Sequence, residues 1–349
     1  MRGSCIGPGS WPPSPALPFW LRGAKGKRCS VRMTALSVII PAFHPRNFDA
    51  LERSMAANAD VDAEWIVVDD GSGAGYDAVF AALPDGVRLI RLPQNSRQGA
   101  ARNAGLAQAQ GERVKFLDAD DQLDKGHLAA LLAATGQEMA IPFAPTKHVF
   151  ANGATHVNDS WRDLPAEPQA QLCRQMVRPF LHHCGALFPR DLLTRLGGYD
   201  ESLITDEDGD LLLRILHEGW HFVPVDGVHY LYIHHKGGVR VSTDDDFAKM
   251  QARIRACDKA LARLGDPPPP DLAQALAQRM DKVAMTYWTA FPAEAKALVV
   301  RARRIASGYV PDMQAPLRLL RAVGGPGMVF AAQGLYRRLK GRPKGGAQG

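Results

Sequence analysis

Residues 113–121 read RVKFLDADD, a short apolar run that ends in three aspartates. The run has no helical period and is long enough for one buried strand. Asp118, Asp120 and Asp121 would repel one another at its carboxyl end unless a cation lay between them. The stretch therefore predicts a buried strand that ends either in a metal site or in a tight turn.

The same pattern, a short apolar run followed by polar residues, occurs three more times upstream. The runs are LSVIIPAF at 36–43, EWIVVDDGS at 64–72 and VRLIRL at 87–92. Stretches of helical character separate them, at 46–58, 74–83 and 98–110, and Gly111 is predicted to stop the last helix. This alternation predicts an α/β fold with a mostly parallel sheet and helices on both faces.

Five aspartates fall at the predicted carboxyl ends of the strands, where open parallel sheets bind their ligands. Asp69 and Asp70 follow the second strand and are suited to accept hydrogen bonds from a nucleobase and a ribose. Asp118 and Asp120 after the fourth strand are suited to hold a divalent cation against a diphosphate. Taken alone, each of these aspartate pairs is also common in turns and at helix caps.

The glycines of GSGAG at 71–75 imitate a dinucleotide-binding loop. No third glycine opens the following helix, and no acidic residue stands about 20 positions on to hold a ribose. Two aspartates directly before the glycines would also repel a pyrophosphate. The sequence therefore argues against a Rossmann dinucleotide site.

The composition is that of a soluble globular protein, 46% apolar and 22% charged over 349 residues. Five scattered cysteines without a C-x-x-C pair argue against a disulfide framework or a zinc site and favour a reducing, cytoplasmic location. Residues 1–33 carry a net charge of +6 and 300–349 carry +9, which leaves −9 for 34–299. An acidic central region argues against nucleic acid as a partner.

These patterns predict three regions. Residues 1–33, rich in proline, glycine and basic side chains, are predicted to be a disordered extension, with Met33 as an alternative start. Residues 34–245 are predicted to form the α/β domain, and 246–349 a basic helical extension with helices at 246–264 and 271–304. In the last stretch Met328, Leu335 and Leu339 share a face beside basic residues, which indicates either a docked helix or peripheral contact with an anionic, cytoplasmic membrane face.

In their order and spacing, LSVIIPAF, WIVVDDGS, NSRQGAARNAGL and VKFLDADD resemble the family 2 inverting glycosyltransferases, which have a GT-A fold. The resemblance covers about residues 36–240. It implies transfer of a sugar from a nucleotide-diphosphate donor, first of all a UDP-sugar, to a hydroxyl of a glycan or lipid-linked acceptor. It also implies a divalent metal, Mn²⁺ or Mg²⁺, and a place in polysaccharide or cell-envelope biosynthesis.

The resemblance also implies roles for individual residues. Phe43 and Asp70 would frame the nucleobase, Asp69 and Arg102 would line the nucleotide pocket, and Asp118 and Asp120 would bind the metal. The full set implied for the nucleotide sugar is Pro41, Phe43, Asp69, Asp70, Arg102, Asn103, Asp118 and Ala119.

A later segment, GGYDESLITDEDGDLLLRILHEGW at 197–220, matches the part of the family that supplies the catalytic base. Inverting transfer needs a base to take the proton of the acceptor hydroxyl. By the resemblance Asp208 is that base, and Glu207 precedes it. From the residues alone, acids at these positions also suit the first turn of a helix.

Histidines follow in YIHHKGGVR at 232–240, where a histidine of the family often reaches the metal or the diphosphate. The candidates are His234, His235 and Arg240. By the resemblance, His234 would bind the metal together with Asp118 and Asp120. The choice between His234 and His235 stays open, because Ile233 stands where many relatives have an arginine. His182 and His183 either face an acceptor pocket or pack.

Two alternative functions would each be recognisable by a feature of the sequence. A sugar nucleotidyltransferase would carry a glycine-rich, basic loop after the first strand, where PAFHPRNFDA stands at 41–50. A non-catalytic sugar-nucleotide-binding module would have lost the D-x-D pair or the base carboxylate, and neither is lost.

Overall fold

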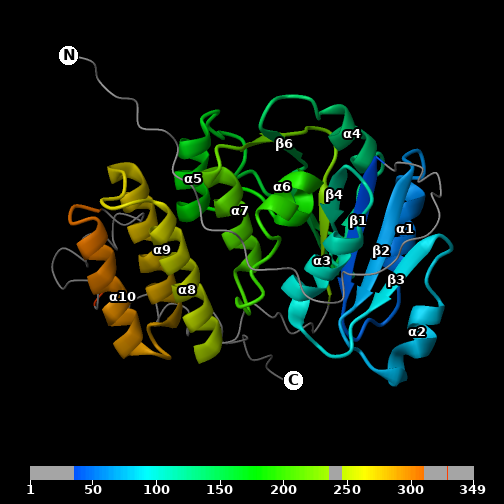
Figure 1. The fold of residues 1–349 in the computed structure, drawn as a ribbon, viewed down its shortest axis with the longest axis horizontal. Helices are drawn as coiled ribbons and strands as arrows, with labels where there is room; N and C mark the ends of the chain where they lie inside the picture. Colours follow the sequence, from blue (N-terminus) through cyan, green and yellow to red (C-terminus); the bar gives the residue numbers. More distant parts are fainter. Residues whose placement is uncertain (1–34, 236–245, 310–327, 329–349) are drawn as a thin grey trace, which may run out of the picture. The chain divides into compact units, whose positions relative to one another are not determined.

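The computed structural model describes residues 35–235, 246–309 and 328 (Figure 1). Three of the predictions lie outside these residues: the disordered extension 1–33 with its alternative start at Met33, the candidate Arg240, and the membrane-surface helix apart from Met328. No helix in the described part of the chain is long and apolar enough to cross a membrane.

The central sheet has the strand order β3-β2-β1-β4-β9. β1 (Leu36–Ala42) pairs in parallel with β2 (Ala63–Asp69) and β4 (Arg113–Phe116), and β2 pairs in parallel with β3 (Val87–Arg91). Only the edge strand β9 (Leu187–Pro189) runs antiparallel. The centres of β1 and β2 are fully buried, as continuous apolar runs covered on both faces must be. The predicted mostly parallel α/β sheet is confirmed.

The connecting helices are α1 (Asp49–Ala57), α2 (Asp77–Ala81) with the short 3₁₀ turn η2 (Ala74–Tyr76), and α3 (Arg97–Gln108). They match the predicted helices to within a few residues. α3 lies close to the sheet because Gly105 faces it: a Cβ atom there would come within 2.4 Å of Ile39 Cγ2. This close packing brings Arg102 of α3 to the carboxyl end of β4.

The predicted role of Gly111 as a helix stop is wrong. α3 ends at Gln108, and Ala109 already has an extended backbone. Gly111 is required for another reason, because a Cβ atom would lie 2.5 Å from the backbone of Leu36 and Ser37. It lets the loop before β4 pass close to the start of β1.

Two small sheets follow that the sequence did not predict. One pairs β6 (Ala140–Phe143) with β10 (His221–Pro224). The other has the order β5-β11-β7-β8, from β5 (Gln122–Leu123), β11 (Tyr230–His234), β7 (Thr146–Phe150) and β8 (Thr155–Val157). β5 begins directly after the three aspartates, so this second sheet starts at the mouth of β4.

The remaining helices form the α-helical part of the protein. They are α4 (His127–Ala133), α5 (Pro168–Val177), the 3₁₀ turn η3 (His183–Gly185), α6 (Arg190–Arg195), α7 (Glu207–His217), α8 (Phe247–Arg263), α9 (Pro270–Tyr287) and α10 (Pro292–Ile305). α9 contacts α5, α8 and α10, and α7 contacts α5 and α8 (Figure 1). Apolar residues of α8, α9 and α10 belong to the same buried cluster as those of the sheet. The predicted helical C-terminal region is confirmed as far as residue 309, and the domain boundary at 245 stays a prediction.

The single helix predicted at 271–304 is wrong, because residues 288–291 form a turn between α9 and α10. Pro292 takes the first position of α10, where its missing N–H is not needed. Phe291 before it is pushed out of the helical region, with φ −135° and ψ 69°. The proline therefore separates two antiparallel helices that the apolar period alone did not distinguish.

Candidate active site

A cleft of about 1090 Å³ opens at the carboxyl ends of β1, β2 and β4. It is the place where a parallel sheet of this kind binds its ligand. Six of the predicted site residues line it: Pro41, Phe43, Asp70, Asp118, Ala119 and Asp120. Asp208, Asp69, Arg102, Asn103 and His234 lie outside its lining.

A stack of three rings stands beside the cleft near the end of β1. Phe43 is exposed and stacks on His44, with ring centroids 3.8 Å apart, and His44 stacks on Tyr76 at 4.5 Å. Phe43 and His44 line the cleft. Such a stack offers a flat apolar surface to a nucleobase. His44 and Tyr76 were missed in the sequence, where only their closeness to Phe43 and to the DDGS turn pointed to them.

The two aspartates that end β2 have different positions. Asp69 is buried, and its Oδ1 accepts a 2.8 Å hydrogen bond from the Ser72 backbone N–H, so it shapes the turn. Asp70 lines the cleft and accepts a 2.7 Å hydrogen bond from the Ser96 N–H. Burial raises the pKa of Asp70 against the opposing effect of that hydrogen bond.

The three aspartates after β4 also differ in position. Asp118 and Asp120 line the cleft, whereas Asp121 is buried and accepts hydrogen bonds from Tyr230 Oη and, at 2.8 Å, from the Ile233 N–H. Burial raises the pKa of Asp120, and the neighbouring Asp118 raises it further. No ion pair of Asp120 occurs within the residues described. A carboxylate pair with this excess of negative charge fits a hard divalent cation.

The two histidines considered as metal ligands, His234 at the end of β11 and His235 directly after it, have different surroundings. His234 contacts His148, with 2.9 Å between Nε2 and Nδ1, and stacks on Phe150. His235 lines the cleft, and its charge lowers the pKa of Asp120. This geometry favours His235 over the predicted His234 as the histidine nearest a metal at Asp118 and Asp120.

Arg102 lies behind Asp118 rather than at the surface of the cleft. Its guanidinium is buried and forms two ion pairs, with Asp118 at 2.8 Å and with Glu207 at 3.0 Å. Burial opposes ionisation of Asp118, but Arg102, His183 and His182 together outweigh it and the pKa of Asp118 falls to about 2. Arg102 thereby connects the D-x-D pair to the first turn of α7.

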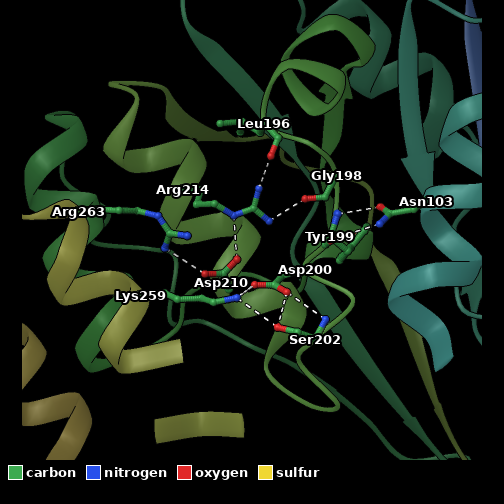
Figure 2. Close-up of polar contacts among 10 residues, drawn as sticks. All are labelled: Asn103, Leu196, Gly198, Tyr199, Asp200, Ser202, Asp210, Arg214, Lys259 and Arg263. Atoms are coloured by element: carbon green, nitrogen blue, oxygen red, sulfur yellow. Dashed lines mark hydrogen bonds and ion pairs between the residues drawn. The ribbon is translucent and has the colours of Figure 1, made fainter. Parts of the chain in front are cut away.

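The loop before α7 is held by polar contacts from three helices (Figure 2). Asn103 of α3 contacts the backbone of Tyr199 on both sides, accepting from its N–H at 2.7 Å and donating to its carbonyl at 2.9 Å. Arg214 donates to the carbonyls of Leu196 and Gly198. Asn103, predicted to bind the nucleotide sugar, therefore clamps this loop.

The acidic residues that begin α7 each have their own partner. Asp206 pairs with Arg279 of α9, and Glu207 pairs with Arg102 of α3. Asp210 is buried between Arg214 at 2.8 Å and Arg263 of α8 at 3.0 Å (Figure 2). Asp208 has no arginine partner among the described residues, and it is the most exposed of the four, at 37% of its side chain against 23% for Asp206.

Asp208 faces His183, whose Nδ1 lies 3.5 Å from Asp208 Oδ2. Burial opposes ionisation, but the surrounding imidazoles and Arg102 outweigh it and hold the pKa of Asp208 below its ordinary value. Burial lowers the pKa of His182 to about 4, so this histidine is neutral at physiological pH. Asp208 is thus the ionised, accessible carboxylate of the acidic run.

His182, His183 and Cys184 also offer three ligand atoms within 4.8 Å of one another, a group that the sequence did not predict. Burial raises the pKa of the Cys184 thiol well above its ordinary value, and Lys115 donates to the Cys184 carbonyl. Arg102 and Lys115 oppose this shift without overcoming it, and a thiol that stays protonated is a poor metal ligand. The cluster is better explained as part of the wall around Asp208.

Glu207 should leave a signature in the pH dependence of stability. Burial and the neighbouring Asp208 raise its pKa from 4.5 to about 7, against the opposing charge of Arg102. Between these values the folded state holds a proton that the unfolded chain has released, so the free energy of unfolding falls as pH rises through this window. We expect a contribution of at most about 3 kcal/mol.

Urea unfolding at pH 5 and pH 7.5 measures this contribution, with Glu207→Gln as the variant that lacks it and Glu201→Gln, an exposed neighbour, as the control. The Glu207→Gln protein should lose less stability between the two pH values than the wild type. Equal losses in all three proteins would contradict the assignment.

Comparison with known proteins finds similarity in sequence and in fold. The family model described as Glycosyl transferase family 2 matches residues 37–197. Succinoglycan biosynthesis protein ExoO of Rhizobium meliloti is 31% identical over 202 residues, which are 54% of this chain and 57% of that protein. A GalNAc(5)-diNAcBac-PP-undecaprenol beta-1,3-glucosyltransferase of Campylobacter jejuni is 38% identical over 127 residues, 34% of this chain and 38% of that protein. The chain thus spans only about half, or less, of the length of these curated relatives.

Two solved structures share the fold. S. aureus TarS in complex with UDP-GlcNAc has a TM-score of 0.60 at 20% identity and covers 87% of this chain and 91% of its own. The mannosyltransferase PcManGT of Pyrobaculum calidifontis, in complex with GDP-Man and Mn²⁺, has a TM-score of 0.50 at 19% identity and covers 91% and 92%. These likenesses agree with the GT-A arrangement of a mostly parallel sheet flanked by helices.

Proposed function

We propose, from the match of residues 37–197 to the family model described as Glycosyl transferase family 2, that the protein transfers a sugar from a nucleotide-diphosphate donor to a hydroxyl of a glycan or lipid-linked acceptor, with inversion. The observation that carries the proposal is the cleft that places Phe43 and Asp70 with the pair Asp118 and Asp120. The cleft offers an aromatic ring for the nucleobase and carboxylates for a metal that would bind the diphosphate. We propose a UDP-sugar as donor, in keeping with the ligand of the TarS structure.

In this proposal Asp118 and Asp120 are the residues that would hold a divalent cation, Mn²⁺ or Mg²⁺, and the cation would supply charge stabilisation for the leaving diphosphate. His235 stands beside them. Asp208 takes the proton of the acceptor hydroxyl while its oxygen attacks the anomeric carbon from the side opposite the diphosphate. Arg102 keeps Asp118 ionised and fixes Glu207 next to the base.

The place of action is proposed to be the cytoplasm, with peripheral association at the membrane face. The support is the name of the Campylobacter relative, which describes a lipid-linked acceptor. A sugar nucleotidyltransferase and a non-catalytic binding module remain the alternatives. Two assays separate the three: a glycosyltransferase releases nucleoside diphosphate from a nucleotide sugar, a nucleotidyltransferase releases pyrophosphate from a nucleoside triphosphate and a sugar 1-phosphate, and a binding module does neither.

Removal of the metal should abolish transfer. Without a cation, Asp118 and Asp120 would repel the donor diphosphate, so excess EDTA should stop turnover and Mn²⁺ should restore it. Asp120→Ala should weaken metal-dependent donor binding, measured by titration calorimetry with UDP-sugars. Asp85→Ala, which removes an exposed aspartate in the turn before β3, is the matched control. Full turnover in excess chelator would contradict the metal role.

A further inference from the structure

His183 lies directly behind the proposed base, between Asp208 and Cys184. It is the first residue of the 3₁₀ turn η3, and only 2% of it is exposed. Its ring packs against those of Phe116 and Tyr199, with ring centroids 6.2 Å and 5.8 Å away. This packing against two aromatic rings holds the imidazole in one orientation behind the carboxylate.

The two ring nitrogens of His183 face two different groups. Nε2 lies 3.2 Å from Sγ of Cys184, and Nδ1 lies 3.5 Å from Oδ2 of Asp208. The second distance is longer than an ordinary hydrogen bond, and Nδ1 is buried with no hydrogen-bond partner in the described part of the chain. A catalytic hydrogen bond is often long without substrate and tightens in the reacting complex. Asp208 is therefore the group that this nitrogen can bond.

The neighbours of the imidazole decide which of its nitrogens carries the proton. Burial lowers the pKa of His183 and raises the pKa of the Cys184 thiol, so a neutral ring stands beside a protonated thiol. The S–H group can donate to Nε2 only if that nitrogen carries a lone pair, which leaves the ring proton on Nδ1. In the other tautomer a lone pair on Nδ1 would face the ionised carboxylate of Asp208. The geometry therefore favours the tautomer with an N–H group on Nδ1.

Asp208 uses one carboxylate oxygen in this contact and keeps the other available. Its side chain is 37% exposed and that of His183 is 2% exposed, so the contact lies on the protein side of the carboxylate. Within the residues described, no hydrogen bond or ion pair involves Oδ1 of Asp208. Glu207, the residue before it, is paired with Arg102 instead. His183 thus holds the buried side of the carboxylate, and Oδ1 is left for a substrate.

We propose that His183 is a positioning residue for the base: its Nδ1–H group holds Oδ2 of Asp208 so that Oδ1 meets the acceptor hydroxyl, and Cys184 selects the tautomer that can do so. This inference rests on the proposed function. In the transfer, the hydroxyl proton moves to Oδ1 and the acceptor oxygen bonds to the anomeric carbon. The bond from that carbon to the diphosphate breaks, and its electron pair leaves with the diphosphate. His183 neither gains nor loses a proton in this step and only fixes the direction from which Asp208 acts.

Two amide replacements of His183 separate positioning from packing. The amide nitrogen of asparagine is as many bonds from Cβ as Nδ1 is, and that of glutamine is as many bonds away as Nε2 is. His183→Asn therefore keeps a donor for Asp208, and His183→Gln does not. His183→Gln should lower kcat about 10–100-fold, and His183→Asn should stay within about threefold of the wild type. The affinity for UDP should be the same in all three proteins.

The readout is release of UDP from UDP-GlcNAc, UDP-glucose and UDP-galactose at saturating concentration, with water or 4-nitrophenyl glycosides as acceptor. Thermal unfolding of each variant checks that the fold is kept. If His183→Gln turned over as fast as the wild type, or His183→Asn lost as much activity as His183→Gln, the positioning role would be overturned. A wild-type chain that releases UDP from none of these donors overturns the proposed function itself.

The tautomer can be tested without any turnover. ¹⁵N NMR of the histidine rings tells a protonated ring nitrogen from one with a lone pair, and loss of signals in His183→Asn identifies those of His183. In the wild type the proton should be on Nδ1. Cys184→Ser, which keeps an O–H donor, should leave it there, whereas Cys184→Ala should move part of it to Nε2. A proton on Nε2 in the wild type would overturn the positioning role, and no difference between the two Cys184 variants would overturn the part assigned to Cys184.

Discussion

Replacing Asp208 with asparagine is expected to reduce sugar transfer by about 10²–10⁴ while donor binding stays nearly unchanged. The variant keeps the shape of the side chain and removes its basicity. Asp208 lies outside the lining of the donor cleft, faces His183 and is the exposed carboxylate of the acidic run. Initial rates with saturating donor, together with titration of the donor in the absence of acceptor, measure the two effects separately.

Asp120→Ala is the comparison that makes this result specific, because it should weaken the donor itself. Asparagine at 208 with near wild-type transfer would remove Asp208 as the base. Loss of donor affinity as large as that of Asp120→Ala would place Asp208 on the donor side. Glu207 is a poor substitute for the role, since its side chain is only 3% exposed and is paired with Arg102.

Replacing Arg102 with methionine is expected to destabilise the fold by about 3–5 kcal/mol. The guanidinium is buried and is the partner of both Asp118 and Glu207, so its removal leaves two carboxylates without their cation. Lys259→Met is the control: Lys259 pairs with Asp200 near the surface, where such a pair is worth about 1 kcal/mol or less. Equilibrium urea unfolding at pH 7.5 measures both.

A second variant distinguishes lost pairing from lost packing. Arg102→Met combined with Glu207→Gln should recover part of the stability, because the buried charge that was left unpaired is removed as well. If the two substitutions were simply additive, or if Arg102→Met were as mild as Lys259→Met, the electrostatic account of Arg102 would fail.

The central sheet could be predicted from the sequence because its strands are continuous apolar runs. LSVIIPAF and EWIVVDDGS appear as β1 and β2, with their aspartates at the expected edge. The sheet of β5, β7, β8 and β11 could not, since its strands are short and their pairing joins residues about 85 apart in the chain, as Tyr232 and His148 are. Its partners are set by tertiary contact and not by local pattern.

Some parts of the candidate site could likewise be predicted from the sequence, and others could not. Asp70, Asp118 and Asp120 follow strands directly, so their place at the cleft was predictable. The pairing of Arg102 with Glu207 joins residues 105 apart, and nothing local marks it. His234 ends β11 and His235 follows it, and which of the two meets the D-x-D pair depends on how the second sheet packs.

The acidic start of α7 is neutralised in part by helices that lie outside the matched family segment. Arg263 of α8 neutralises Asp210, and Arg279 of α9 neutralises Asp206, while the family match ends at residue 197. The C-terminal helices are therefore not interchangeable attachments. A chimaera that joined the sheet and α7 of this chain to the C-terminal helices of a relative would need an incoming cation opposite Asp206, whereas Asp210 would keep Arg214 of its own helix. Exchanging these helices between relatives thus requires Arg279 to be kept together with Asp206.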